Sequence, residues 1–385
     1  MRQVRTRRQA LLPHNQRRFL ALLGLIMGLR ELSMTMLNPF ISAYSRELTG
    51  GTPLLAGIAL GIYGLTNGIF QMPYGMLSDR FGRKRLLAVG LLQLFFGLLI
   101  AGLTSNMYVF IFARALQGSG ALMGVAYAWI GDRTTEETGG SAMSLIGMIV
   151  APAAIIAFVI GPPLNGFLTL KTMFFGSALL TIAGFAAVFF LTHDELPTVR
   201  LSADTARVVD RRLFCTAGLG LISNHVLASL FFVLPDRFTT RWPSSDLWFV
   251  FAPALLFGLI AIRVVARMRC AFKGTAVLAL FLLFAGAAAL DGSSPVCLFL
   301  AAAGVLSGFM LLTVGLPNDL NHLYSARQRG MASGILQTFT FIGFFSGSFV
   351  SGLLSQFGAS GWIAGQMDAA VALGGLCWLG MCGKH

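Results

Sequence analysis

Twelve long apolar stretches follow one another along this chain and restrict it to a membrane-spanning fold. A helix needs about 20 mostly apolar residues to cross a bilayer. Hydrophobic residues make up 56% of the 385 positions and charged residues only 11%, whereas soluble domains carry about 25% charged residues. We predict spans at residues 19–41, 54–77, 86–104, 107–130, 142–168, 171–192, 213–234, 246–266, 275–291, 295–316, 331–354 and 360–381.

The basic residues gather on one side of these spans. With the N-terminus placed in the cytoplasm, the inside segments hold 22 of the 28 Lys and Arg residues, the outside loops hold four, and Arg30 and Arg114 lie within spans. Positive charge favours the cytoplasmic side. We therefore expect both termini in the cytoplasm, and we assign the net charge of +13 to topology and lipid headgroups rather than to nucleic-acid binding.

The longest polar connection divides the spans into two groups of six. We expect a cytoplasmic basic tail (1–18), an N-terminal six-helix bundle (19–192), a cytoplasmic linker (193–212) and a C-terminal six-helix bundle (213–385). The predicted fold class is all-α, with twelve transmembrane helices in two pseudo-symmetric bundles. Secondary transporters commonly have this plan.

Several classes of function lack their sequence signatures here. The chain has no G-x-x-x-x-G-K-[ST] motif, which argues against ATP-driven transport. It has no nucleophile–base or paired-carboxylate pattern of an enzyme. The five cysteines show no paired-ligand spacing, so we interpret them as packing residues. We expect no enzymatic activity, no cofactor and no metal site.

A dense charged cluster, GMLSDRFGRKRLL at 75–87, lies between the second and third spans. Gly75 leaves room for a close helix approach, and Asp79 can accept charge-assisted bonds from nearby arginines or a facing helix N-terminus. A topology anchor alone needs neither of these residues, although it remains the alternative. We predict a gating cluster made of Gly75, Asp79, Arg80, Gly82, Arg83 and Lys84.

This cluster closely resembles the signature loop between helices 2 and 3 of the major facilitator superfamily. Residues 57–87 and 113–122 are also similar to the YajR-type drug:proton antiporters of that superfamily. The resemblance implies the fold above, a location in the bacterial cytoplasmic (inner) membrane, and an Asp–Arg network that latches the two halves together on the cytoplasmic side. We expect the chain to lack the extra C-terminal soluble domain of full-length YajR-type proteins.

The fourth span contains a charge at bilayer depth, Arg114, followed by Gln117, Gly118 and Gly120. A charge there costs about 2.5–3.5 kcal/mol on insertion scales, so Arg114 should face the bundle interior and have a partner. In the antiporters that this chain resembles, the matching arginine is associated with proton coupling, and the resemblance implies that role here. A structural arginine that bonds helix carbonyls is the alternative.

The first span carries Glu31, Thr35, Asn38 and Ser42 on one helix face, as expected of a cavity-lining helix. Glu31 is the best candidate for the proton-carrying group, and Arg30 precedes it. The proton-coupling candidates are therefore Glu31, Arg114 and Arg30. A structural ion pair between Glu31 and either arginine is the alternative. Pro39 should bend the outer end of this span.

Further candidates lie in other spans. Gly161 and Pro162 match part of a fifth-helix motif of the drug antiporters and predict a close helix interface at the extracellular end. The cavity candidates are Thr35, Asn38, Asn224, His225, Gln337 and Thr340. For His225, a bonded structural role is the alternative.

We expect a monomeric secondary transporter that works by alternating access in the lipid bilayer and exports a small amphipathic molecule in exchange for protons. Two alternatives stay open. One is metabolite uptake or facilitated diffusion on the same fold, and the other is a membrane sensor or scaffold that transports nothing.

Overall fold

The computed structural model describes residues 13–135, 138–191, 210–268, 270–292, 294–324 and 326–382. Within them, twelve helices are long and apolar enough to cross a membrane, which confirms the predicted number. The N-terminal half contains α1 (His14–Thr35), η1 (Asn38–Phe40), α2 (Ile41–Glu47), α3 (Pro53–Phe81), α4 (Arg83–Leu103), α5 (Met107–Ser119), α6 (Leu122–Arg133), α7 (Gly139–Phe167) and α8 (Leu170–Val188). The C-terminal half contains α9 (Arg211–Thr239), η3 (Ser244–Leu247), α10 (Trp248–Met268), α11 (Phe272–Ala289), α12 (Pro295–Leu323), α13 (Ala326–Gln356), η4 (Ser360–Trp362) and α14 (Ile363–Cys382).

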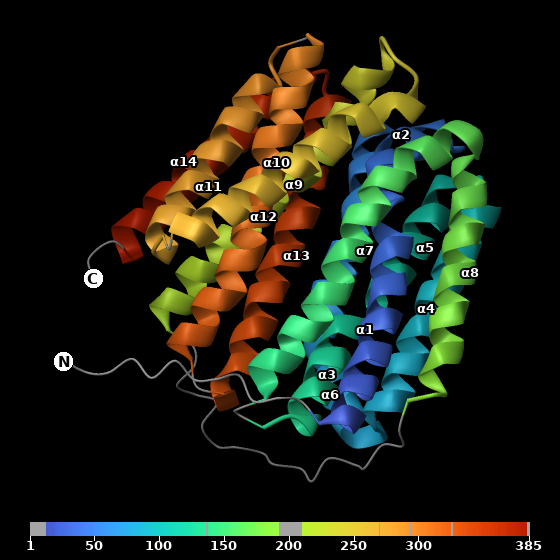
Figure 1. Cartoon of the computed structure of the whole chain (residues 1–385). Coiled ribbons are helices and arrows are strands. Elements are labelled where there is room, and N and C mark those ends of the chain that lie inside the picture. The colour runs from blue at the N-terminus through green and yellow to red at the C-terminus, as the bar shows by residue number, and fades with distance from the viewer. Residues whose placement is uncertain are drawn as a thin grey trace.

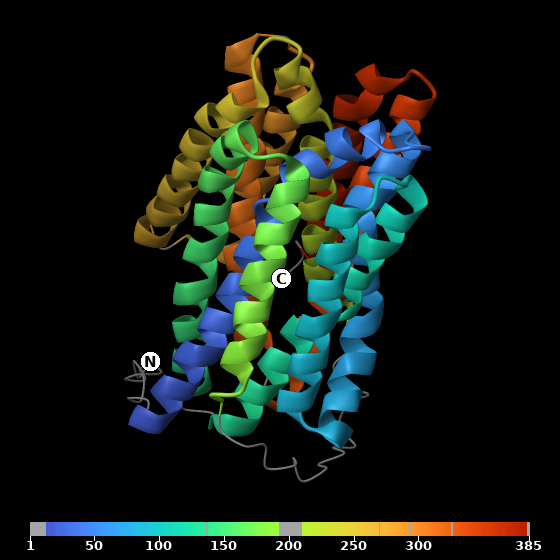
Figure 2. The same ribbon diagram turned by 90° about the vertical axis from the view of Figure 1, so that its right-hand side faces the viewer.

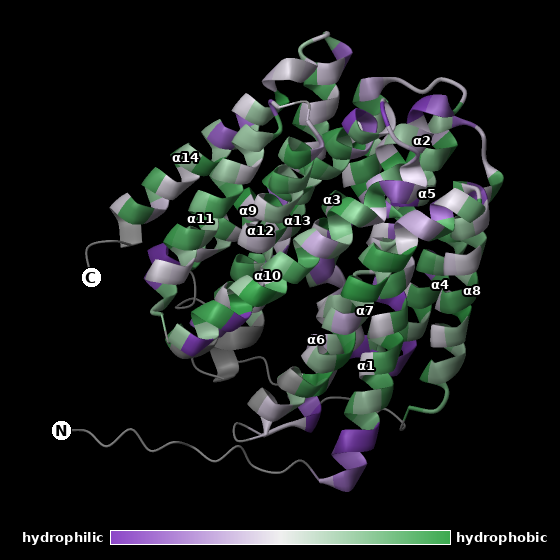
Figure 3. Cartoon of the chain, turned by 45° about the horizontal axis from the view of Figure 1, so that its top comes forward, coloured by the Kyte–Doolittle hydropathy of each residue, from purple (hydrophilic) through white to green (hydrophobic). Residues whose placement is uncertain are grey.

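The two halves stand side by side, with their helices running between two ends of the molecule (Figures 1 and 2). We call the end where α1 and α9 begin the linker end, and the opposite end, which carries α2, the far end. Hydrophobic residues cover the lengths of the helices, and hydrophilic residues gather at the start of α1 and around α2 (Figure 3). Large apolar side chains such as Phe96, Phe112 and Leu179 are exposed, as a lipid-facing surface requires.

Several helices start where the sequence places a capping side chain. Thr52 accepts a hydrogen bond from Leu55 N at 3.2 Å, and Pro53 follows as the first helical residue of α3. Asn106 accepts bonds from the first turn of α5. Ser294 caps α12 in the same way, at 3.1 Å from Cys297 N. These caps satisfy backbone N–H groups that a helix start leaves without partners.

Two of the spans are broken. The first passes through η1 at Pro39, where the sequence predicted a bend. The fourth, predicted as continuous over 107–130, is divided between α5 and α6 at Ala121, whose φ is +39°. The glycines Gly118 and Gly120 have low helix propensity, which weakens the helix at this point.

Helix α3 of the N-terminal half faces α13 of the C-terminal half across the boundary between them. The space between these two helices widens towards the linker end. A Cβ atom placed on Gly61 would lie 2.8 Å from Phe345 Cα. On Gly68 it would lie 3.3 Å from Phe341 Cβ, and on Gly75 it would meet nothing within 4 Å. Along these helices the halves are closed at the far end and apart at the linker end. The close approach expected at Gly75 is therefore absent from this conformation.

Enlarging Gly61 should open the far end. Overpacking costs about 1–3 kcal/mol, which shifts a two-state equilibrium by about 5–150-fold. Leu54 N and Gln356 Oε1 are 3.4 Å apart at the far end, so cysteines at these two positions, in a background without native cysteines, report closure by cross-linking. We expect Gly61→Val to lower the cross-linked fraction severalfold. Gly365→Val, at a glycine with open space around it, is the control, and equal yields from both variants would contradict the closure described here.

Candidate functional site

A buried charged cluster joins α1 to α3. Arg30 Nη1 lies 2.8 Å from Glu31 Oε2, and Arg30 Nη2 donates to the hydroxyl of Tyr63. Thr35 Oγ1 donates to the other carboxylate oxygen, Glu31 Oε1, at 3.0 Å. Arg30 and Tyr63 are buried, while the Glu31 side chain is 24% exposed. The carboxylate is thus held on both oxygens and is still partly open to its surroundings.

Arg114 is fully buried beside this cluster, and its bonds are to neutral acceptors. Its Nε donates to Ala59 O at 3.2 Å, its Nη1 to Gln117 Oε1 at 2.6 Å and its Nη2 to Asn38 Oδ1 at 3.4 Å. The Arg114 guanidinium lies 5.3 Å from the centroid of the Tyr63 ring, and that of Arg30 lies 5.7 Å from the same centroid. The Tyr63 ring therefore contacts both cations, a favourable arrangement for an aromatic face.

Four polar residues around this cluster were not among the predicted site residues. Tyr63 is central to it, and Tyr127 of α6 interacts electrostatically with Arg30 and Glu31. Asn67 and Gln71 continue the Tyr63 face of α3 towards the linker end, and their side-chain oxygens are buried with no hydrogen-bond partner among the described residues. The spacing of four residues from Tyr63 to Asn67 to Gln71 was the available signal, since it places them on one helix face.

The predicted gating cluster forms a network centred on Arg83. Its Nε lies 2.8 Å from Asp132 Oδ2, and its Nη2 pairs with Asp79. Its Nη1 donates to Ser78 Oγ and, at 3.3 Å, to the Gly75 carbonyl. These bonds hold α3, α4 and α6 together, all within the N-terminal half. Asp132 was not predicted as part of this network, because it lies 49 residues from Arg83 in the chain and no local pattern links the two.

The remaining residues of the gating cluster have separate surroundings. Gly82 has a φ of +96°, which turns the chain from α3 into α4 at little cost for a glycine. Lys84 Nζ donates to Leu191 O at 2.7 Å, at the end of the α8 span. The Arg80 guanidinium lies 5.6 Å from the Phe81 ring centroid. The latch between the two halves stays a prediction for a conformation in which the linker end is closed.

Polar contacts join the two halves at the far end, and we call this set of contacts the far-end seam. Arg46 of α2 pairs with Asp236 of α9, and the Arg46 guanidinium lies 5.6 Å from the Phe232 ring centroid. Ser42 Oγ donates to Phe232 O at 3.3 Å. Asn165 of α7 donates to Ser244 Oγ of η3 at 3.1 Å. Arg46 is one of the four Lys and Arg residues that the predicted topology places in the outside loops, and its pairing with Asp236 was not predicted.

Reversing one charge of this pair should weaken the far-end seam. Both side chains are about a third exposed, and such pairs contribute only about 0.2–1 kcal/mol, but Arg46→Asp also faces Asp236 with a like charge. We expect Arg46→Asp to reduce the Leu54–Gln356 cross-link less than Gly61→Val does. The swapped pair, Arg46→Asp with Asp236→Arg, should restore it. A swapped pair that stays as low as the single variant would argue against a direct pairing.

The glycine motifs allow close helix packing at several points. A Cβ atom on Gly120 would lie 2.7 Å from Gly90 O of α4, and Gly118 packs on the backbone of Tyr63. On Gly161 it would lie 2.9 Å from Met36 O, next to the break in the first span. Pro162 follows within α7. Gly161 therefore allows α7 to pack closely on the end of the first span, and its match to the fifth-helix motif of the drug antiporters stays a prediction.

The candidates of the C-terminal half bond to other residues of the same half. His225 has its Nδ1 2.9 Å from Ser346 Oγ and its Nε2 2.6 Å from Gln366 Oε1. Asn224 donates to Gly220 O at 3.0 Å. Thr340 donates to Leu336 O at 2.8 Å, and Gln337 is half-buried. The contacts of His225 favour the bonded structural role, because they tie α9 to α13 and α14.

A side-chain hydrogen bond joins the start of α9 to the end of α12 at the linker end of the C-terminal half. Tyr324, just after α12, donates to Asp210 Oδ1 at 2.6 Å, and the same oxygen accepts from Leu213 N to cap α9. Burial and the hydrogen bond to Asp210 raise the pKa of Tyr324 above its ordinary value. The phenol therefore stays protonated at neutral pH and keeps α9 bonded to the end of α12.

The sequence comparisons with known proteins agree on one protein family. The family model described as Major Facilitator Superfamily matches residues 23–290. Inner membrane transport protein YajR of Escherichia coli (strain K12) is 31% identical over 372 residues, which cover 91% of this chain and 81% of YajR. Multidrug resistance protein D of the same strain is 31% identical over 144 residues, 37% of this chain and 36% of that protein. The crystal structure of the nucleoside transporter NupG has the same fold, with a TM-score of 0.70 at 13% identity over 96% of this chain and 100% of NupG.

Proposed function

Because this chain belongs to the major facilitator superfamily and is a membrane transporter rather than an enzyme, we propose that it exports a small amphipathic molecule in exchange for protons. Export would proceed by alternating access, in which the two halves rock and expose a central site to each side in turn. The observation that carries the proposal is the partly exposed carboxylate of Glu31, bonded within a buried cluster that holds two arginines.

Charge explains how Glu31 would couple protons to movement. When ionised, it neutralises one of the two guanidinium groups that contact Tyr63. A proton on Glu31 would remove that counter-charge and leave two buried cations, which is costly. Arg30 lies on the span that continues to Arg46 of the far-end seam, and Tyr63 lies two residues from Gly61. A rearrangement of the cluster would therefore act on the N-terminal side of the far-end closure, at Arg46 and at Gly61.

Protons need a route to this cluster. We assign the route to the face of α3 that carries Asn67 and Gln71, whose buried oxygens have no partner in the described part of the chain. Buried polar groups of this kind commonly bind water. Because the basic residues favour the linker end as the cytoplasmic side, the route would open to the cytoplasm of a bacterial inner membrane, the membrane named for YajR.

The latch is part of the same proposal. In the conformation that closes the linker end, the Arg83 network would face the C-terminal half, and Asp79, 53% exposed in the present conformation, is available for a contact there. Asp79→Asn should therefore reduce transport while membrane insertion stays intact. The measurement is transport per amount of inserted protein, with Asp291→Asn, at an exposed aspartate of the far end, as the control. Unchanged transport in Asp79→Asn would argue against the latch.

Flux with and without a proton gradient tests the proposed function. Purified protein in proteoliposomes is given a panel of lipophilic cations and small metabolites under an imposed pH gradient, and a protonophore then collapses the gradient. Antiport predicts that accumulation stops. Continued flux would favour facilitated diffusion or metabolite uptake. Binding without any flux would favour a sensor or scaffold. The partial match to a multidrug resistance protein supports the use of drug-like molecules in the panel.

A further inference from the structure

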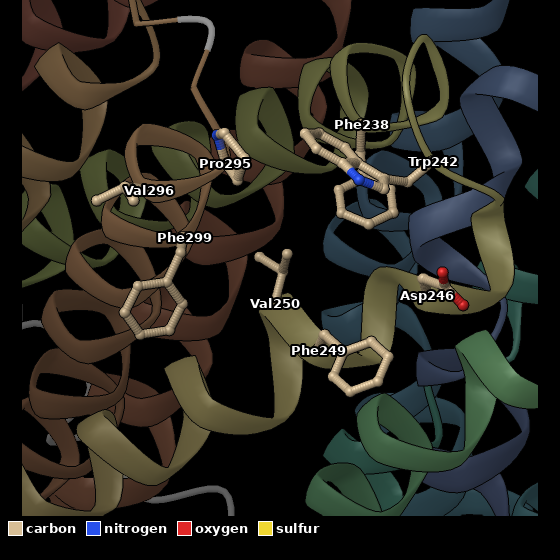
Figure 4. A pocket seen from close by; sticks show the side chains of 8 residues that line it. All are labelled: Phe238, Trp242, Asp246, Phe249, Val250, Pro295, Val296 and Phe299. Atoms are coloured by element: carbon tan, nitrogen blue, oxygen red, sulfur yellow. The ribbon is translucent and has the colours of Figure 1, made fainter.

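A cavity of about 420 Å³ lies at the far end of the C-terminal half, away from Glu31, and we call it the far-end pocket (Figure 4). It opens between α9, η3, α10 and α12. Its lining consists of four aromatic residues, three aliphatic residues and one carboxylate: Phe238, Trp242, Phe249, Phe299, Val250, Val296, Pro295 and Asp246. Its volume lies within the range of about 300–1,000 Å³ that small-molecule sites occupy.

The chemistry of the lining suits an organic cation. Phe238 and Trp242 pack with their ring centroids 5.3 Å apart, and Figure 4 shows these two rings and Asp246 on one side of the cavity, with Phe299 on the other. Aromatic faces attract cations, and tryptophan does so most strongly. A carboxylate beside such rings adds a full negative charge. The same lining disfavours anions.

Asp246 has few partners of its own. Its carboxylate accepts a hydrogen bond from Ser245 Oγ at 3.2 Å. It forms no ion pair within the segments that the structure describes. A partly buried carboxylate on an otherwise apolar wall is stabilised by a cation. The lining itself holds no lysine, arginine or histidine, so the cation would come from a ligand.

The far-end pocket is also open at the surface of the molecule and adjoins the far-end seam. Phe249 and Val296 are 59% and 63% exposed, as expected for residues that meet lipid. Asp246 lies two residues after Ser244, which accepts the bond from Asn165 across the halves. When the far end opens, η3 has to separate from α7, and Asp246 would move with it.

We propose that the far-end pocket is a second binding site, for an amphipathic organic cation, on the side where cargo leaves the transporter. The proposal rests on the proposed export function for its place in transport, but its chemistry follows from the pocket alone. A lipid acyl chain would also fill an apolar cavity, but an uncharged chain gains nothing from Asp246. Dependence on Asp246 therefore distinguishes the two occupants.

Direct binding tests this assignment. Purified protein is incubated with tritiated tetraphenylphosphonium, and binding is measured by equilibrium dialysis, with tetraphenylborate as a probe of the same shape and opposite charge. Asp246→Asn removes the charge, and Trp242→Leu keeps apolar bulk but removes the aromatic face. Asp291→Asn removes a carboxylate from the same end of the molecule but outside the lining. Glu31→Gln separates this pocket from the central cluster.

We expect Asp246→Asn and Trp242→Leu each to weaken tetraphenylphosphonium binding about tenfold, with no such loss in Asp291→Asn and with binding at the pocket retained in Glu31→Gln. Tetraphenylborate should not compete. Equal binding by Asp246→Asn, Trp242→Leu and wild type would overturn the assignment, as would binding that only Glu31→Gln removes. Neither result affects the proton-coupled flux assay, so this proposal and the proposed function fail separately.

Discussion

Arg114→Ala should both destabilise the protein and stop transport. The fully buried guanidinium supplies hydrogen bonds to Ala59 O, to Gln117 Oε1 and to Asn38 Oδ1. Each buried acceptor left without a partner costs about 1–3 kcal/mol. Thermal unfolding in detergent should therefore show a loss of several kcal/mol, well above that of Arg267→Ala, whose side chain is exposed.

Arg114→Lys separates the two roles considered for this residue. Lysine keeps the positive charge beside Tyr63 but cannot reproduce the planar fork of donors. If Arg114 is mainly structural, the lysine variant should lose stability, and whatever transport remains should stay coupled to protons. If Arg114 takes part in coupling, the remaining flux should no longer follow the pH gradient. An Arg114→Ala protein as stable as wild type would contradict the bonding described for this site.

Glu31→Gln should abolish transport driven by a proton gradient while leaving exchange of substrate for substrate. Glutamine keeps the size and the hydrogen-bonding carbonyl of glutamate, so the bond from Thr35 can remain. It cannot gain or lose a proton. Exchange needs the halves to rock with substrate bound, but accumulation against a gradient needs a proton to be carried back.

The comparison is made in proteoliposomes. Accumulation of a substrate under an imposed pH gradient is compared with exchange of labelled for unlabelled substrate at equal pH on both sides. We expect accumulation in Glu31→Gln to fall to the level of liposomes without protein, and exchange to persist. Glu47→Gln, at an exposed glutamate of α2, should retain both activities. Accumulation that survives in Glu31→Gln would leave this residue with the structural ion pair as its role.

The spans were predictable because hydropathy is a local property. A run of about 20 apolar residues identifies a span wherever its neighbours lie in space. The break at Pro39 was predictable for the same reason, since proline acts on its own helix. The break at Ala121 was not, because its left-handed backbone depends on how Gly118 and Gly120 pack against other helices.

The site was predictable only in part, because charge is visible in a sequence and packing is not. Glu31 and Arg30 are neighbours in the chain, and charged residues within an apolar span are recognisable from the sequence alone. Tyr63 sits in an apolar stretch like any packing residue, and only the crossing of α1 and α3 brings its hydroxyl to Arg30. Arg46 and Asp236 are likewise joined only by the meeting of the two halves.

Whether the predicted gating cluster contacts the other half depends on the conformation of the protein. The motif at 75–87 was identified from its charges and glycines, and its network is present around Arg83. In this conformation, however, the far end is closed by α3 against α13, while Gly75 faces open space. The sequence is the same in every conformation of a transporter. It therefore cannot indicate which contacts form in one conformation and which form in another.

A pH-sensitive dye inside proteoliposomes shows directly whether the protein exchanges substrate for protons. A substrate from the panel is added outside at equal pH on both sides. Antiport predicts that the lumen becomes more alkaline as protons leave in exchange, in wild type and in Glu47→Gln but not in Glu31→Gln. Substrate entry without any change in luminal pH would contradict proton antiport, and an equal change in Glu31→Gln would contradict the role of Glu31.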